Sequence, residues 1–157
     1  TSNNLAIAYK ELSDLTSDPA ALKKAIAVYR EVIDATSRED LPLDWADYKK
    51  NLGNALVILA DYENPVASID EALAVYAEAA EITTLDRGAD KWKQLQNAIS
   101  MSMLMKSLKA FDVTYAKQAR DLAIATRDKL REIGAPDEAY YEMFVPMAEQ
   151  VIALFPQ

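Results

Sequence analysis

Two stretches of the chain decide the fold: Trp45-Ala-Asp-Tyr-Lys-Lys-Asn-Leu-Gly-Asn-Ala-Leu-Val-Ile-Leu59 and Ile69-Asp-Glu-Ala-Leu-Ala-Val-Tyr-Ala-Glu-Ala-Ala80. In both, large apolar residues recur at steps of three and four, which is the spacing of one face of an α-helix. Pro65 lies between the two stretches, where it ends one helix and permits the next. The sequence therefore predicts two amphipathic helices joined by a short turn.

The pattern returns when the sequence is compared with itself at a shift of 47 residues. Ala27-Val28-Tyr29 then falls on Ala74-Val75-Tyr76, and Trp45 falls on Trp92. About a dozen such coincidences in one phase, several between large or aromatic residues, indicate an internal repeat. We expect one domain of residues 1–157, with repeats at about 1–40, 41–87 and 88–134 and a terminal helix at 135–157.

No stretch of alternating β-branched residues competes with the helical pattern. The chain also has only 3 Gly and 6 Pro, which are too few turn-forming residues for a many-stranded fold. The sequence predicts an all-α fold with helices near 3–14, 19–36, 43–61, 66–84, 89–109, 112–133 and 137–155.

Composition and charge exclude several classes of function. The chain has no Cys and no His, which removes thiol nucleophiles, histidine bases and most zinc sites. A net charge of −8 repels a phosphate backbone, so we expect no nucleic-acid partner. Asp86-Arg-Gly-Ala-Asp90 is too short for a calcium-binding loop, and no glycine-rich phosphate loop occurs. The sequence therefore predicts neither catalytic activity nor a bound cofactor.

The ends of the chain and its apolar runs bear on location. No run reaches the length of about 18 apolar residues that spans a bilayer, so we expect no membrane insertion. The sequence starts at Thr1 inside a helical pattern, without a basic and then apolar leader. We expect a cytoplasmic protein, and a chain that is a fragment of a longer one.

A family resemblance rests on the second repeat. Leu52-Gly53 followed by Ala72, Tyr76 and Ala79 resembles the tetratricopeptide repeat signature, and the 47-residue period resembles its longer bacterial variant. The resemblance implies about three antiparallel helix hairpins and a terminal helix, stacked in a right-handed superhelical solenoid. It also implies a protein–protein interaction scaffold that binds a peptide or protein segment in a concave groove lined by the first helix of each hairpin.

Aligning Leu52-Gly53 with the family's Leu-Gly pair indicates which residues face the groove. Lys50 and Asn54 resemble half of the clamp by which some family members grip a peptide's terminal carboxylate, and they are equally well explained as solvated surface. Met101 and Met105 suit either core packing or ligand contact, because a thioether adapts its shape. The acidic chain favours a partner with a basic stretch. The expected peptide-binding residues are Asp47, Lys50, Asn54, Gln94, Asn97, Met101 and Met105.

The terminal helix carries two apolar stripes, with Pro146 expected to bend it. We expect one stripe to pack on the third repeat: Tyr140, Met143, Met147, Val151 and Leu154. The other stripe lacks an evident cover, and a large uncovered apolar surface favours association. An alternative function is therefore a structural or assembly module, which forms a homodimer or stacks on further repeats. The expected self-association residues are Tyr141, Phe144, Ile152 and Phe155.

Overall fold

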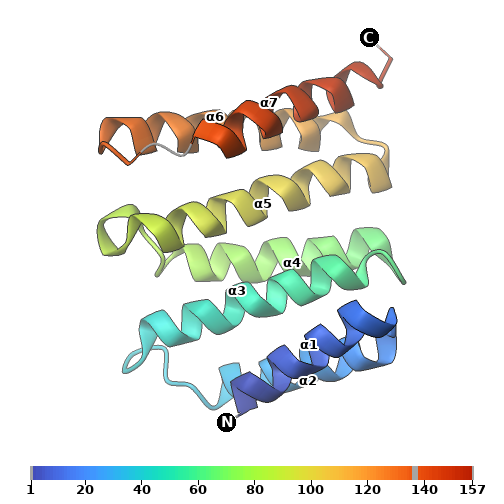
Figure 1. Ribbon diagram of the computed structural model, residues 1–157, viewed down its shortest axis with the longest axis vertical. Coiled ribbons are helices and arrows are strands. Elements are labelled where there is room, and N and C mark those ends of the chain that lie inside the picture. The colour runs from blue at the N-terminus through green and yellow to red at the C-terminus, as the bar shows by residue number, and fades with distance from the viewer. Residues whose placement is uncertain (1, 136–137, 157) are drawn as a thin grey trace. The chain divides into compact units, whose positions relative to one another are not determined.

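The computed structural model describes residues 2–135 and 138–156, and over these residues it is all-helical with no strand. The all-α prediction is confirmed, and every predicted helix is present with its ends shifted by a few residues. A short 3-10 helix, η1 (Leu85–Arg87), occupies a predicted joint. The α-helices are α1 (Ser2–Thr16), α2 (Pro19–Asp34), α3 (Pro42–Leu59), α4 (Pro65–Ala80), α5 (Ala89–Ala110), α6 (Val113–Glu132) and α7 (Glu138–Ala153) (Figure 1).

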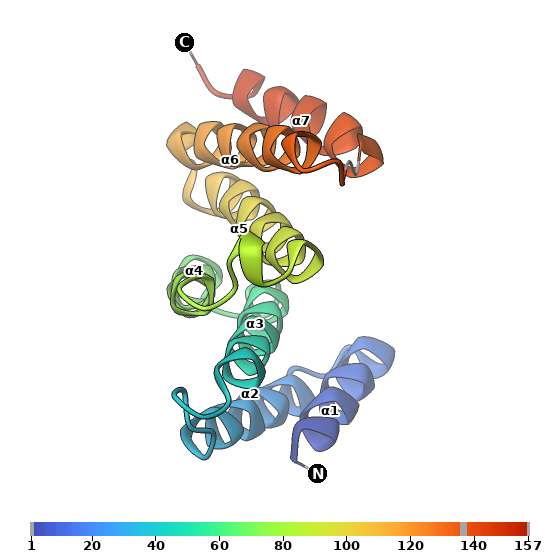
Figure 2. The same ribbon diagram turned by 90° about the vertical axis from the view of Figure 1, so that its left-hand side faces the viewer.

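The helices form two compact units, Thr1–Thr83 and Thr84–Gln157. In the first unit α1 packs on α2, α2 on α3, and α3 on α4. In the second unit α5 packs on α6, and α6 lies beside α7 (Figure 2). Helices that follow each other in the sequence therefore supply most of the packing within each unit.

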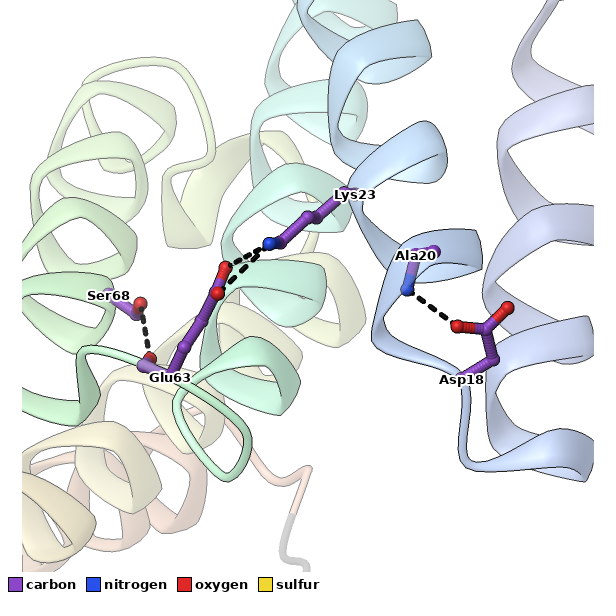
Figure 3. Close-up of polar contacts among 5 residues, drawn as sticks. All are labelled: Asp18, Ala20, Lys23, Glu63 and Ser68. Carbon is purple, nitrogen blue, oxygen red and sulfur yellow. Dashed lines mark hydrogen bonds and ion pairs between the residues drawn. The ribbon is translucent and has the colours of Figure 1, made fainter.

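Side-chain caps and prolines set the starts of several helices. The backbone N–H of Ala20 donates to Asp18 Oδ1 at 2.8 Å, which satisfies a donor that the first turn of α2 leaves free (Figure 3). Asp112 does the same for α6, because the Thr114 N–H donates to its Oδ1 at 2.9 Å. That hydrogen bond favours the ionised carboxylate, and it lowers the pKa of Asp112.

The turn inside each helix pair has the same backbone conformation at the same repeat position. Ser17, Asn64 and Phe111 have φ values of 53°, 45° and 53°, in the left-handed region. The three residues are 47 positions apart, as the sequence repeat is. The repeat seen in the sequence is thus also a repeat of local backbone geometry.

Each unit buries aromatic residues in its own core. Tyr29 and Tyr76, 47 residues apart, are both buried in the first unit, and burial raises the pKa of Tyr29. In the second unit small α6 side chains pack beneath the rings of α7. The core of that unit consists of Leu104, Ala116, Ala119, Ala123, Leu130, Tyr141, Phe144, Ala148 and Val151.

Candidate functional site

Three of the expected peptide-binding residues lie on α3. Asp47, Lys50 and Asn54 follow each other at steps of three and four, so they share one side of the helix. All three are partly buried. Lys50 Nζ lies 4.0 Å from Asp47 Oδ1, so part of the lysine charge is balanced within the same helix.

Asn54 is held in place by a buried tyrosine of the neighbouring helix. The Tyr76 hydroxyl, on α4, donates to Asn54 Oδ1 at 2.7 Å. Because the amide oxygen accepts this bond, the amide nitrogen with its two N–H donors points away from Tyr76. The amide thus has a fixed orientation on α3.

Asn97 on α5 is held in the same manner, from α7. The Tyr141 hydroxyl donates to Asn97 Oδ1 at 2.9 Å, and the Tyr140 hydroxyl donates to the Asn97 backbone oxygen at 3.4 Å. Burial, and secondarily the neighbouring Tyr141, raises the pKa of Tyr140 to about 12. Each unit therefore contains one asparagine whose side-chain oxygen is occupied by a buried tyrosine.

The other three expected residues lie on α5 with Asn97, at steps that keep them on one side of the helix. Gln94 is exposed, whereas Met101 and Met105 are partly buried. Met101 packs against the core of the second unit, as Met103 does. Core packing therefore accounts for Met101 and Met103. The α3 and α5 residues belong to different compact units.

The expected self-association stripe on α7 is covered. Tyr141 and Phe144 are fully buried in the core of the second unit, and Ile152 and Phe155 pack against that core. The prediction that this stripe lacks a cover is wrong. The physical reason is the run of alanines on α6, which leaves room for the two rings, together with the hydroxyl partner that Asn97 offers to Tyr141.

The stripe that the sequence predicted to pack on the third repeat is only partly covered: Val151 is buried, and Tyr140 and Met147 pack against the core. Met143 and Leu154, which the sequence predicted to pack on the third repeat, are 62% and 74% exposed. Pro146 lies inside α7 on an exposed position. Two adjacent tyrosines begin this helix, so the apolar pattern alone did not distinguish the buried stripe from the exposed one.

A hollow that sequence reasoning missed lies between α2 and α4. Its volume is about 370 Å³, and Ile26, Leu56 and Leu59 contribute to its lining. Lys23 and Glu63 also belong to its lining, and Lys23 Nζ lies 2.8 Å from Glu63 Oε1; Figure 3 draws this ion pair. Arg30 and Glu71 form a second ion pair at 2.5 Å. These pairs join residues about 40 positions apart, so no local motif identifies them.

Among the described residues there is no group of acidic side chains arranged to hold a metal ion. In the same part of the chain, no helix has the length and apolar character needed to cross a membrane. Comparisons of the chain with protein-family models, curated proteins and solved structures found no match.

Proposed function

We propose that the chain is a non-enzymatic, tetratricopeptide-like interaction scaffold that binds an extended peptide or protein segment. In this proposal the helix pairs stack as a right-handed solenoid, and α1, α3 and α5 line the concave groove. Three left-handed turn residues spaced by 47 positions support the helical-repeat part of the proposal.

The tyrosine-held amides of Asn54 and Asn97 are the observation that carries the binding function. A peptide backbone presents carbonyl acceptors, and an amide whose oxygen is already occupied presents N–H donors to them. Buried Tyr76 and Tyr141 hold these donors in place before a ligand arrives, which lowers the entropic cost of binding. Each unit offers one such amide, on α3 or on α5, which suits backbone recognition with little dependence on peptide sequence.

Charge adds a preference to this backbone recognition. The chain carries a net charge of −8, which attracts a partner with a basic stretch. The ion pair of Lys50 with Asp47 leaves Lys50 less able to attract an acidic peptide. Affinity for a basic peptide should then fall as salt is added.

The alternative function, assembly through α7, relied on an uncovered stripe at Tyr141 and Phe144. Both side chains are buried within the second unit, so the alternative has lost the exposed surface on which it rested. Peptide binding is therefore the function that we propose.

The test is the affinity of peptides selected on the full chain from a random-sequence display library. Asn54→Asp and Asn97→Asp keep the acceptor for the tyrosine hydroxyl and remove the N–H donors. We expect each substitution to lower the affinity for a neutral selected peptide about two- to tenfold, which corresponds to the loss of one hydrogen bond. Asn51→Ala, on the same helix as Asn54, is the matched control and should leave affinity unchanged. Unchanged affinity in the folded double variant would show that these amides are not the binding site.

A further inference from the structure

One side of α1 is apolar and open to solvent. Leu5 and Leu12 are 48% and 46% exposed, and Ala8 between them is also exposed. Steps of three and four residues place all three on one face of the helix. An apolar face of this composition, two leucines with an alanine between them, is typical of a helix that packs on another element rather than of one that faces solvent.

The second helix pair shows what covers this face when it is complete. The residues 47 positions later, Leu52, Ala55 and Leu59, are only 3%, 0% and 9% exposed. The preceding helix α2 packs on α3, and it lines hollows together with Leu52 and Leu59. Equivalent positions are thus buried where a helix lies over them and bare where none does.

Two isoleucines of α2, seven residues apart, line hollows together with leucines of α3. Ile26 of α2 lines one hollow together with Leu56 and Leu59 of α3. Ile33 lines another together with Leu52. Two aliphatic side chains of α2, seven residues apart, therefore face these α3 leucines across the two hollows.

We propose that the Leu5–Ala8–Leu12 face of α1 binds an amphipathic helix of a partner protein, in the position that α2 takes on α3. The repeat equivalence of this face with the α3 face that α2 packs on identifies the occupant. It must present two aliphatic side chains seven residues apart, as Ile26 and Ile33 do.

The charges beside the face define the partner further. Where α2 covers α3, Arg30 of the covering helix pairs with Glu71 at 2.5 Å. The residue 47 positions before Glu71 is Lys24, which reverses the charge at that place. Lys24 Nζ lies 5.7 Å from the ring centroid of Tyr9, so the charge sits beside α1. The partner helix should therefore carry an acidic residue where α2 carries Arg30, between its two aliphatic anchors.

Two synthetic peptides test this proposal on the isotope-labelled full chain. One copies residues 18–36, and the other copies them with Arg30→Glu. We expect both to perturb the NMR signals of Leu5, Ala8 and Leu12 on titration. The Glu peptide should bind about two- to fivefold more tightly at low salt, the range of an exposed ion pair. Lys24→Glu should reverse this preference.

Variants separate this face from other surfaces. Leu5→Asp with Leu12→Asp should abolish peptide binding, and because both side chains are half-exposed the fold should persist. The matched control is Leu43→Asp, at a leucine of similar exposure on α3. Asn54→Asp should leave this binding unchanged, so failure here is distinguishable from failure of the proposed peptide groove.

Three outcomes would overturn the proposal. The first is the absence of any perturbation on α1 at saturating peptide. The second is perturbation at Leu52 and Leu59 instead, which would mean that the peptide replaces α2. The third is a dimer in light scattering that the Leu5→Asp, Leu12→Asp variant loses, because the face would then belong to a second copy of the chain.

Discussion

The ring of Tyr76 packs against the Cα of Gly53, which carries no side chain. A Cβ added at residue 53 would lie 2.4 Å from Tyr76 Cε1 and 2.7 Å from Cζ, well inside van der Waals contact. The hydroxyl of the same ring donates to the next residue, Asn54. The glycine thus lets α4 approach α3 closely enough for the tyrosine to hold the candidate site.

Gly53→Ala should therefore destabilise the chain by about 1–3 kcal/mol, the usual cost of overpacking. Denaturant unfolding measures this change in the free energy of unfolding. Gly88→Ala is the control, because a Cβ there meets no atom within 4 Å. In a Tyr76→Leu background the cost of Gly53→Ala should shrink, since the ring that it strikes is gone. An equal cost in both backgrounds would refute the proposed clash.

Phe111→Gly should stabilise the chain by about 0.5–1 kcal/mol. Phe111 has φ 53° and ψ 41° and is 86% exposed, so it bears the strain of a left-handed backbone with little contact in return. Glycine removes a backbone strain of about 1–2 kcal/mol. Part of this gain is offset, because glycine also increases the conformational entropy of the unfolded chain. Thermal unfolding compares this variant with Asn64→Gly, where the gain should be smaller because Asn tolerates this conformation. A lower melting temperature for Phe111→Gly would contradict the expectation.

Tyr140 should make the chain sensitive to alkali. Its pKa is raised from 10.0 to about 12, first by burial and then by Tyr141, so the folded state favours the neutral phenol. The resulting stability is fully present below pH 10 and is lost as the pH rises toward about 12. Unfolding free energy measured across this range should fall less steeply in Tyr140→Phe than in the unmodified chain. An equally steep fall in Tyr140→Phe would contradict the expectation.

Lys49→Ala should cost more stability than Lys23→Ala, although each lysine forms one ion pair at 2.8 Å. The Lys49 side chain is 13% exposed and Lys23 is 54% exposed, so solvent screens the Lys23 pair far more. Lys49 Nζ also lies 5.0 Å from the centroid of the Trp45 ring, an interaction worth about 0.5–1 kcal/mol. Urea unfolding at low and high salt checks both points. Equal losses of stability in the two variants would show that burial does not strengthen the Lys49 ion pair relative to the Lys23 pair.

The candidate site was predictable only in part. The resemblance of Leu52-Gly53 to the family's Leu-Gly pair indicated Asn54 and Asn97 as groove residues, and this assignment stays a prediction. It did not predict their tyrosine partners, since Tyr76 is 22 residues from Asn54 and Tyr141 is 44 residues from Asn97. Hydrogen bonds between helices depend on how the helices are placed in space, which a one-dimensional pattern does not specify.

The sequence by itself determined the seven α-helices that the described residues form, and the turns between them. Amphipathic spacing and the 47-residue repeat are local or periodic properties, and prolines and capping aspartates set where the helices begin. Only the tertiary structure decided which side of α7 is buried. Two apolar stripes compete on that helix, and the choice depends on the alanines of α6 and on the hydroxyl partner at Asn97. Burial of one apolar stripe rather than another depends on the shape and polarity of the neighbouring helix, not on hydrophobicity alone.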